Sequence, residues 1–319
     1  MLKVAFQCLK ACVSMLILLA GITSSISATE SSARAERKVG VLLVNHGSRS
    51  ETWRASLLAL EASVRPTLMT NPAVQGIKTA FMEYTEPSIA TRMKEFDSEG
   101  FTDVVIVPIF LTVSPHTFDD IPTIIGKRID PQSLELLKIE RIERYTPKAN
   151  VVVAPNLDFP GVLKENILRR AKMLSTDPAN EGLVLIAYGD ETYEKEWAAL
   201  LGGIGNYVGT ETGIAAFSHG WCGHVVHYNP AKTTEAIEEV LKTKKRAVVI
   251  PVLVAHDENF QIKIIGGGIA KVADNQSRVV YRPDSILPDL NIEQWVVRIA
   301  NQHASEIAEG RHLASVQRP

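Results

Sequence analysis

This sequence has little net charge and few cysteines, and each of these features excludes a class of protein. Its 319 residues carry a formal net charge of −2, so neither a nucleic-acid surface nor a polybasic membrane surface is indicated. Of its 3 cysteines, Cys8 and Cys12 lie near the start and only Cys222 lies in the body of the chain. An intramolecular disulfide in that body is therefore excluded, and its stability must come from a hydrophobic core.

The first residues differ in kind from the rest. Lys3 and Lys10 precede an apolar run over residues 11–22, and a small, polar stretch follows at 23–28. This order is typical of a secretory signal peptide. We therefore assign residues 1–28 to a signal peptide and 29–37 to a flexible leader, and we expect export to the periplasm. An uncleaved membrane anchor at the N-terminus is the alternative, although a spanning helix needs about 20 apolar residues. We expect no membrane span in the mature chain.

The pattern that follows predicts an α/β fold. Short runs rich in β-branched residues are apolar on both faces, as buried parallel strands are; they lie at 39–45, 77–82, 104–111 and 151–154. Helical patterns separate them at 52–68, 87–98 and 118–129. This alternation predicts a parallel sheet that helices cover on both sides. The charged stretch within residues 127–150 suits an edge strand and a solvated helix equally well.

The second half of the chain repeats this plan. Residues 183–188 resemble 41–46, and residues 247–255 resemble 103–111. The prolines and the arginine of the segment 152–170 recur at identical spacing in 280–298. Such self-similarity indicates an internal duplication with a turn-rich joint near 175–181. We predict two duplicated lobes at 38–176 and 182–310, each a small parallel sheet flanked by helices.

Titratable residues follow the predicted strands of the first lobe. His46 follows the first strand, Glu83 the second and His116 the third. Ligands of parallel α/β sheets bind beyond the carboxyl ends of the strands, and two imidazoles with a carboxylate suit a divalent ion such as Co²⁺, Ni²⁺, Fe²⁺ or Zn²⁺. Singly, such a His is often a capped loop residue and such a Glu is usually solvated. Their coincidence on adjacent strands favours a shared metal site.

The second lobe has lost part of this set and gained other histidines. Tyr188 stands where His46 does, so we expect one principal site. We place His219 near the position of Glu83 and match His256 to His116. A second metal or haem-type site is one interpretation of the histidines and cysteine of this lobe, and a glycine-rich lid loop with incidental histidines is the other; the residues concerned are His219, Cys222, His224, His227 and His256. A covalent haem motif is absent.

Three segments carry a resemblance to a known family. VLLVNHGSRSE at 41–51, AFMEYTEPSI at 80–89 and GFTDVVIVPIFLTVSPHTFDDIP at 100–122 resemble the sirohydrochlorin cobaltochelatase/ferrochelatase family, the class II tetrapyrrole chelatases in their long, two-lobed form. The resemblance is specific over 38–126 and weaker over 183–300. It implies a cleft between the lobes that takes the macrocycle, with His46, Glu83 and His116 as metal-binding and catalytic residues.

This sequence departs from the family where a glycine-rich segment usually leads into the last histidine, because Val113-Ser114-Pro115 stands there. The departure stiffens the loop that the tetrapyrrole would pass. The resemblance implies Co²⁺, Fe²⁺ or Ni²⁺ as the substrate metal and no organic cofactor.

Chelation requires the metal to lose water and the pyrrole nitrogens to lose two protons. The two histidines can hold the ion or accept a proton near neutral pH, and Glu83 can offset the metal charge and take the other proton. Hydrogen-bond donors should face the substrate carboxylates; the candidates are Ser48, Arg49, Thr112, Ser114 and, as an additional one, Lys127. For Arg49, a solvated residue at the start of a helix is an equally good interpretation.

The favoured function is therefore a chelatase that inserts Co²⁺ or Fe²⁺ into a reduced tetrapyrrole such as sirohydrochlorin. The predicted export favours a different protein on the same fold, a carrier of metal or tetrapyrrole without turnover. A sugar- or anion-binding two-lobed protein ranks last, because it needs no histidines at strand ends. We expect a small-molecule tetrapyrrole partner and no nucleic acid. The sequence leaves the metal and the oligomeric state open.

Overall fold

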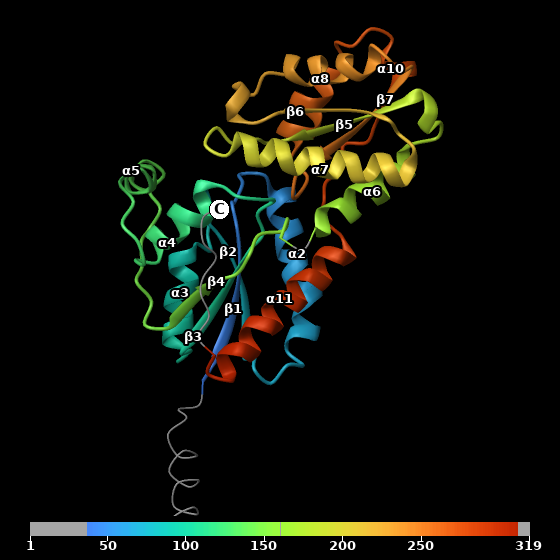
Figure 1. Cartoon of the computed structure of the whole chain (residues 1–319). Helices are drawn as coiled ribbons and strands as arrows, with labels where there is room; N and C mark the ends of the chain where they lie inside the picture. The colour runs from blue at the N-terminus through green and yellow to red at the C-terminus, as the bar shows by residue number, and fades with distance from the viewer. Residues whose placement is uncertain (1–36, 160, 312–319) are drawn as a thin grey trace, which may run out of the picture. The chain divides into compact units, whose positions relative to one another are not determined.

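Two four-stranded parallel sheets with the same strand order form the core of the protein (Figure 1), with the orders β2-β1-β3-β4 and β6-β5-β7-β8. The computed structural model describes residues 37–159 and 161–311, and from Lys38 onward the chain forms one unit. The predicted signal peptide (1–28) and all of the leader (29–37) except Arg37 lie outside the described residues, as does Pro160 of the repeated segment. The predicted α/β fold with two similar sheets is confirmed.

The first sheet has β1 (Val39–Asn45) at its centre, between β2 (Gly76–Phe81) and β3 (Asp103–Pro108), with β4 (Asn150–Val153) at the edge beyond β3. Every residue of β1 is buried, as expected for a parallel strand covered on both faces. Asn45 pairs with Phe81, and Val44 pairs with Pro108. The carboxyl ends of these three strands therefore lie side by side.

The second sheet repeats this arrangement with β5 (Glu181–Ala187) at its centre, flanked by β6 (Ala216–Trp221) and β7 (Arg246–Val252), and with β8 (Val279–Tyr281) outermost. Ala187 pairs with both Trp221 and Val252. The strand ends of this lobe are therefore aligned in the same way as those of the first lobe.

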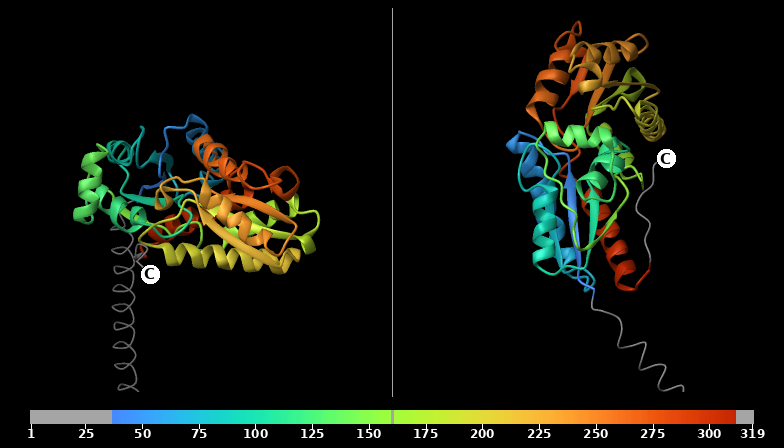
Figure 2. Two further views of the ribbon diagram at one scale, coloured as in Figure 1. Left: turned by 90° about the horizontal axis from the view of Figure 1, so that it is seen from above. Right: turned by 90° about the vertical axis from the view of Figure 1, so that its left-hand side faces the viewer.

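Helices cover both faces of each sheet. In the first lobe, α3 (Ile89–Ser98), α4 (Ile121–Ile124) and α5 (Pro131–Ile139) share one apolar core with the sheet. In the second lobe, α8 (Ala231–Leu241) packs on one face and α7 (Glu194–Thr212) on the other (Figure 2). The shorter helical segments are η1 (His116–Asp120), η2 (Pro178–Asn180), η3 (His224–Val226), η4 (Asn259–Gly266), α9 (Gly267–Ile269) and α10 (Asn275–Arg278).

The two lobes exchange their last helices. Helix α6 (Val162–Leu174) follows β4 along the chain but contacts α7 and β7 of the second lobe. Helix α11 (Leu290–Ala308) follows β8 but packs against α2 (Glu51–Leu68), β1 and β3 of the first lobe (Figure 1). The division into 38–176 and 182–310 by chain position therefore does not describe where these two helices pack.

A buried polar junction fixes the exchange. Asp289 caps the start of α11 by accepting hydrogen bonds from the backbone N–H groups of Asn291 and Ile292, at 2.8 and 3.0 Å. The same carboxylate accepts a hydrogen bond from Asn166 of α6 at 2.8 Å and pairs with Arg169 of α6. The two exchanged helices are thus joined where each approaches the other lobe.

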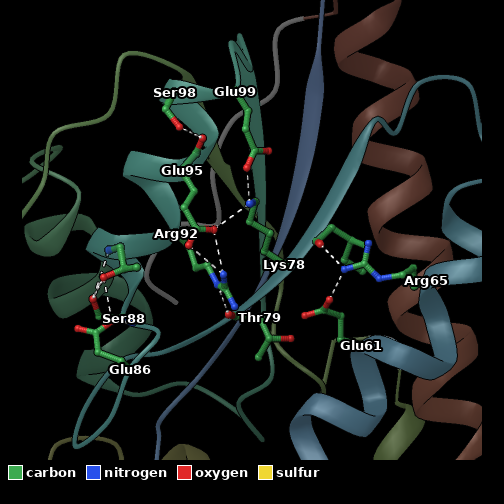
Figure 3. Close-up of polar contacts among 12 residues, drawn as sticks. Glu61, Arg65, Lys78, Thr79, Glu86, Ser88, Arg92, Glu95, Ser98 and Glu99 are labelled. Carbon is green, nitrogen blue, oxygen red and sulfur yellow. Dashed lines mark hydrogen bonds and ion pairs between the residues drawn. The ribbon is translucent and has the colours of Figure 1, made fainter.

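Charged side chains protect the exposed edge of the first sheet. Arg65 and Arg92 donate hydrogen bonds to the backbone carbonyls of Ile77 and Thr79 on β2, at 2.7 and 2.9 Å (Figure 3). Lys78 on the same strand pairs with two glutamates of the α3 region. Charges on an edge strand oppose pairing with a strand of another molecule.

Two regions differ from the sequence-based expectation. The helix expected at 118–129 is a π-helical turn followed by the short α4, and the chain turns away at Gly126. The stretch 127–150 contains α5 but no strand until β4, so its charged end at 140–145 is neither an edge strand nor a helix. Tyr145 instead bonds Asp97 at 2.8 Å, which ties this segment to the end of α3.

None of the helices in the described part of the chain combines the length and apolar character that a membrane span requires.

We expect Asp289→Ala to destabilise the protein by about 2–4 kcal/mol, because it removes a helix cap and leaves Asn166 and Arg169 without their carboxylate. Urea unfolding measures the change. Asp130→Ala is the matched control, because Asp130 caps the surface helix α5 through Ser133 and should cost only about 1 kcal/mol. Equal losses in the two variants would contradict a role of Asp289 beyond capping.

Candidate metal site

The structure brings His46, Glu83 and His116 together at the carboxyl ends of β1, β2 and β3. Ligand atoms of the three side chains all lie within 4.8 Å of one another. His46 Nε2 lies 3.9 Å from Glu83 Oε2, and the two imidazole rings meet edge to face with centroids 4.9 Å apart. In the described residues this is the one group of three or more His, Cys, Asp or Glu side chains with such spacing.

Glycine at position 47 allows the first two strand ends to approach so closely. Gly47 adopts φ +94°, and a Cβ there would lie 2.2 Å from the carbonyl oxygen of Glu83. The backbone N–H of Glu83 donates to the carbonyl of His46 at 2.8 Å. Any larger residue at position 47 would push Glu83 away from His46.

Hydrogen bonds at Nδ1 set the tautomer of both histidines. His46 Nδ1 lies 3.1 Å from the carbonyl oxygen of Gly47, and His116 Nδ1 lies 2.7 Å from the Oδ2 of Asp120. A carbonyl and a carboxylate only accept hydrogen bonds, so each Nδ1 carries the proton. Each Nε2 therefore keeps a lone pair for a metal ion, as in the carboxylate–histidine pairs of metalloproteins.

The electrostatic environment favours neutral histidine at His46. Burial, followed by the nearby His116, lowers the pKa of His46 below its ordinary value. Burial raises the pKa of Asp120, but its hydrogen bond with His116 and further hydrogen bonding outweigh burial and hold that pKa below the usual range. Asp120 is thus ionised beside His116 and is itself buried, with an exposed fraction of 3%.

A cavity of about 770 Å³ adjoins the three residues, and residues from both lobes line it. His46 and His116 face it from the first lobe, and Tyr188 and Asp257 from the second. Ser48 Oγ donates a hydrogen bond to Asp257 Oδ2 at 2.9 Å. The strand ends of both lobes therefore border one shared space, whose volume lies within the range of small-molecule sites.

The four predicted substrate-binding residues all line this cavity. Ser48 is engaged by Asp257, and Thr112 donates its hydroxyl hydrogen to Asp158. Arg49 is exposed and lies over the Tyr84 ring, 4.9 Å from its centroid. Ser114 is 5% exposed, and its hydroxyl has no hydrogen-bond partner among the residues that the structure describes, so it is the one of the four with an unused buried donor.

Lys127 does not belong to this group. Its ammonium donates to the carbonyl oxygen of Val151 on β4, and it does not line the cavity. Burial lowers the pKa of this lysine. The expectation that Lys127 meets a substrate carboxylate is therefore wrong, because the chain turns away after α4.

Backbone hydrogen bonds show which residues of the second lobe replace the metal-binding set. The N–H of Gly223 donates to the carbonyl of Tyr188 at 3.0 Å, as that of Glu83 does to His46. Tyr188 is thus the counterpart of His46, as predicted. Gly223, and not His219, is the counterpart of Glu83.

The match between His256 and His116 is also wrong. Pro108 pairs with Val44, and Pro251 pairs with Ile186 two residues before Tyr188, so the prolines are equivalent. Counting forward from them puts Asn259 at the position of His116, and each of these residues begins a π-helical turn. The predicted match depends on the Ile-Ile-Gly sequences at 124–126 and 264–266, but these lie three residues apart when they are counted from the equivalent prolines.

The residues proposed for a second metal site are not brought together. His224 lines the cavity, and His219 lies on β6 between Phe217 and Trp221, with ring centroids 6.0 and 5.1 Å away. Burial raises the pKa of the fully buried Cys222. His256 bonds the carbonyl of Pro283 at 2.9 Å, and His227, in the left-handed region with φ 50°, does not line the cavity.

The prediction from the sequence omits four residues of the site or its cavity: Asp120, Tyr84, Tyr228 and Phe260. Asp120 follows His116 by four positions, a spacing that places both on one side of a helical turn. Tyr84 directly follows Glu83 and has φ 67°, and burial raises its pKa to about 12. Tyr228 and Phe260 line the cavity from the second lobe, and no local pattern marked them.

Comparison with known proteins gives concordant results. The family model described as CbiX matches residues 40–174. A sirohydrochlorin cobaltochelatase of Methanococcoides burtonii is 33% identical over 101 residues, which are 31% of this chain and 70% of that protein. One from Methanothermobacter thermautotrophicus is 31% identical over 97 residues, which are 30% of this chain and 64% of that protein.

Solved structures resemble the whole two-lobed fold. The sirohydrochlorin chelatase SirB from Bacillus subtilis subspecies spizizenii, in complex with cobalt, has a TM-score of 0.60 at 17% identity and covers 86% of this chain and 97% of its own. SirB from Bacillus subtilis with Fe³⁺ has a TM-score of 0.61 at 18% identity and covers 86% and 98%. At such identity these structures establish the fold alone.

We expect Ala at His46, Glu83 or His116 to weaken Co²⁺ binding by more than the roughly 10–100-fold that loss of an outer partner costs, because each removes a direct ligand. Calorimetric titration of the folded variants with Co²⁺ measures the effect. His224→Ala and His256→Ala are the controls, since both remove an imidazole outside the group. If the two control variants lost as much Co²⁺ affinity as the three site variants, the assignment of the site would be contradicted.

Asp120→Asn should lower Co²⁺ affinity by roughly 10–100-fold, because the amide no longer holds His116 Nδ1 as a charged acceptor does. The same titration at several pH values measures it. Asp120→Glu keeps a carboxylate and should recover part of the affinity that Asp120→Asn loses. Equal Co²⁺ affinities in the two variants, with unchanged stability, would argue against this role.

Proposed function

Since the chain belongs to the class II tetrapyrrole chelatase family, we propose that it inserts a divalent metal ion into sirohydrochlorin or a closely related reduced tetrapyrrole. The observation that carries the proposal is the convergence of two imidazoles and one carboxylate beside a cavity of about 770 Å³. That set leaves coordination positions open, which a chelatase needs because the metal must pass to another set of ligands.

The reaction exchanges one divalent cation for two protons. The macrocycle gives up two N–H protons, its nitrogens gain the metal, and the ion loses its water and protein ligands. The lone pairs at Nε2 of His46 and His116 can hold the ion first and accept a proton once it has left. Glu83 offsets positive charge beside His46 and can take the other proton.

The metal ion that the protein inserts is Co²⁺ or Fe²⁺ in this proposal. Imidazole and carboxylate accept both ions. The relatives from Methanococcoides burtonii and Methanothermobacter thermautotrophicus are cobaltochelatases, and SirB structures hold cobalt in one case and Fe³⁺ in another. We propose Co²⁺ or Fe²⁺ as the substrate, with their relative rates to be measured on this protein.

A carrier that binds metal or tetrapyrrole without turnover is the second candidate. The feature that favours it is the signal-peptide pattern in residues 1–28, because an exported chelatase would need its substrate outside the inner membrane. Export to the periplasm remains our proposal for the location of the protein. Comparing the first residue of the purified native protein with the predicted boundary after residue 28 tests it.

Incubation of the protein with Co²⁺ and metal-free sirohydrochlorin, followed by absorbance, distinguishes the two functions. We expect repeated turnover in the native protein, and loss of turnover in His46→Ala and His116→Ala. His256→Ala should retain the native rate, because this imidazole is bound to a backbone carbonyl away from the site. Stoichiometric binding without product would contradict the chelatase and support the carrier.

A further inference from the structure

The second lobe presents aromatic rings at the same strand ends where the first lobe presents its metal ligands. Tyr188 occupies the position of His46, while Gly223 and Asn259 occupy those of Glu83 and His116. None of the three replacements offers an imidazole or carboxylate. The duplication has therefore kept the frame of the site in the second lobe and changed its chemistry.

Tyr188 is the centre of an aromatic cluster at these strand ends. Its ring centroid lies 5.5 Å from those of His224 and Phe260. Its hydroxyl lies 3.4 Å from the hydroxyl of Tyr228 and 3.4 Å from His224 Nδ1. Tyr228 and Phe260 are also neighbours, with centroids 6.3 Å apart. We call Tyr188, His224, Tyr228 and Phe260 the aromatic wall.

All four members of the aromatic wall line the cavity that also contains His46 and His116. The four come from three separate segments: Tyr188 follows β5, His224 and Tyr228 follow β6, and Phe260 lies in η4. Only the folded chain brings these segments into contact. Tyr228 is 45% exposed, so part of its ring surface remains uncovered by the neighbouring Tyr188 and Phe260. The wall thus offers ring surface to a bound molecule.

The chemistry of Tyr188 suits apolar contact rather than metal binding. Burial and the hydroxyl of Tyr228 raise the pKa of Tyr188 far above its ordinary value. The phenol therefore stays neutral at physiological pH. A neutral phenol is a poor ligand for a divalent ion, whereas its ring stacks well on a conjugated system.

Charge at the cavity is mixed. Arg49 and Lys263 line it together with four acidic residues, Glu51, Asp190, Asp257 and Glu258. Three of the four acidic residues, Asp190, Asp257 and Glu258, belong to the second lobe, against one basic residue there, Lys263. This side of the cavity therefore carries more negative than positive charge and would repel ligand carboxylates. The second lobe therefore favours the conjugated face of a ligand, and the carboxylates should lie toward the two basic residues or toward solvent.

We propose that the aromatic wall binds one face of the conjugated tetrapyrrole, while His46, Glu83 and His116 deliver the metal to its other face. The assignment rests on the proposed function, since it takes the tetrapyrrole as the ligand. It gives the two lobes separate tasks. The first lobe holds the metal, and the second lobe holds and orients the ring.

Titration of the protein with metal-free sirohydrochlorin, in the absence of metal, tests the wall separately from turnover. We expect Tyr188→Leu and Phe260→Leu each to raise the dissociation constant by roughly 5- to 100-fold, the range that loss of aromatic stacking on a heterocycle gives. Tyr188→Phe keeps the ring and should bind like the native protein. Co²⁺ affinity measured by calorimetry should be unchanged in all three.

Tyr207→Leu is the matched control, because Tyr207 lies on α7, bonds Glu165 at 2.7 Å and does not line the cavity. Tyr228→Leu is a second variant at an exposed position, in case Tyr188→Leu does not fold. Native affinity for sirohydrochlorin in folded Tyr228→Leu and Phe260→Leu would overturn the wall, even if the native protein turns over. Weakened binding in these variants, with no turnover in the native protein, would support the wall and overturn the chelatase.

Discussion

Parallel pairing of β1 with both of its neighbours is the constraint on which the site depends. Because β1 lies between β2 and β3, the carboxyl ends of all three strands meet, and the residues that follow them converge. A shift by one residue in either pairing would turn each side chain to the other face and separate His46 from Glu83 or His116. Burial of β1 on both faces makes such a shift costly, so the hydrophobic core fixes the arrangement of these three side chains.

The duplication shows how one frame supports two chemistries. Both lobes share the same strand order, the same backbone contact after the central strand and a helical turn after the third. The first lobe places the candidate metal ligands His46, Glu83 and His116 at these positions, and the second carries aromatic side chains around them. The exchange of α6 and α11, joined at Asp289, ties each lobe to the other. That connection keeps both sets of strand ends at one cavity.

Much of this could be predicted from the sequence, because periodicity and strand-end position are local properties. The strands, the two-lobed plan and the grouping of His46, Glu83 and His116 follow from them. Contacts between distant segments cannot be predicted in this way: the exchange of α6 and α11, the hydrogen bond from Lys127 to Val151 of β4 and the aromatic wall all depend on tertiary packing. Similar short sequences predict the wrong counterparts of Glu83 and His116, namely His219 and His256. The strand register places Gly223 and Asn259 at those positions.

An anomalous difference map at the cobalt absorption edge, from crystals soaked in Co²⁺, tests the central claim most directly. The claim is that the first lobe alone holds the metal, through His46, Glu83 and His116. We predict one peak bonded to these three side chains and none at Tyr188, His224 or His256. A peak on the histidines of the second lobe, or an ion that leaves either His46 or His116 without a bond to it, would contradict the account.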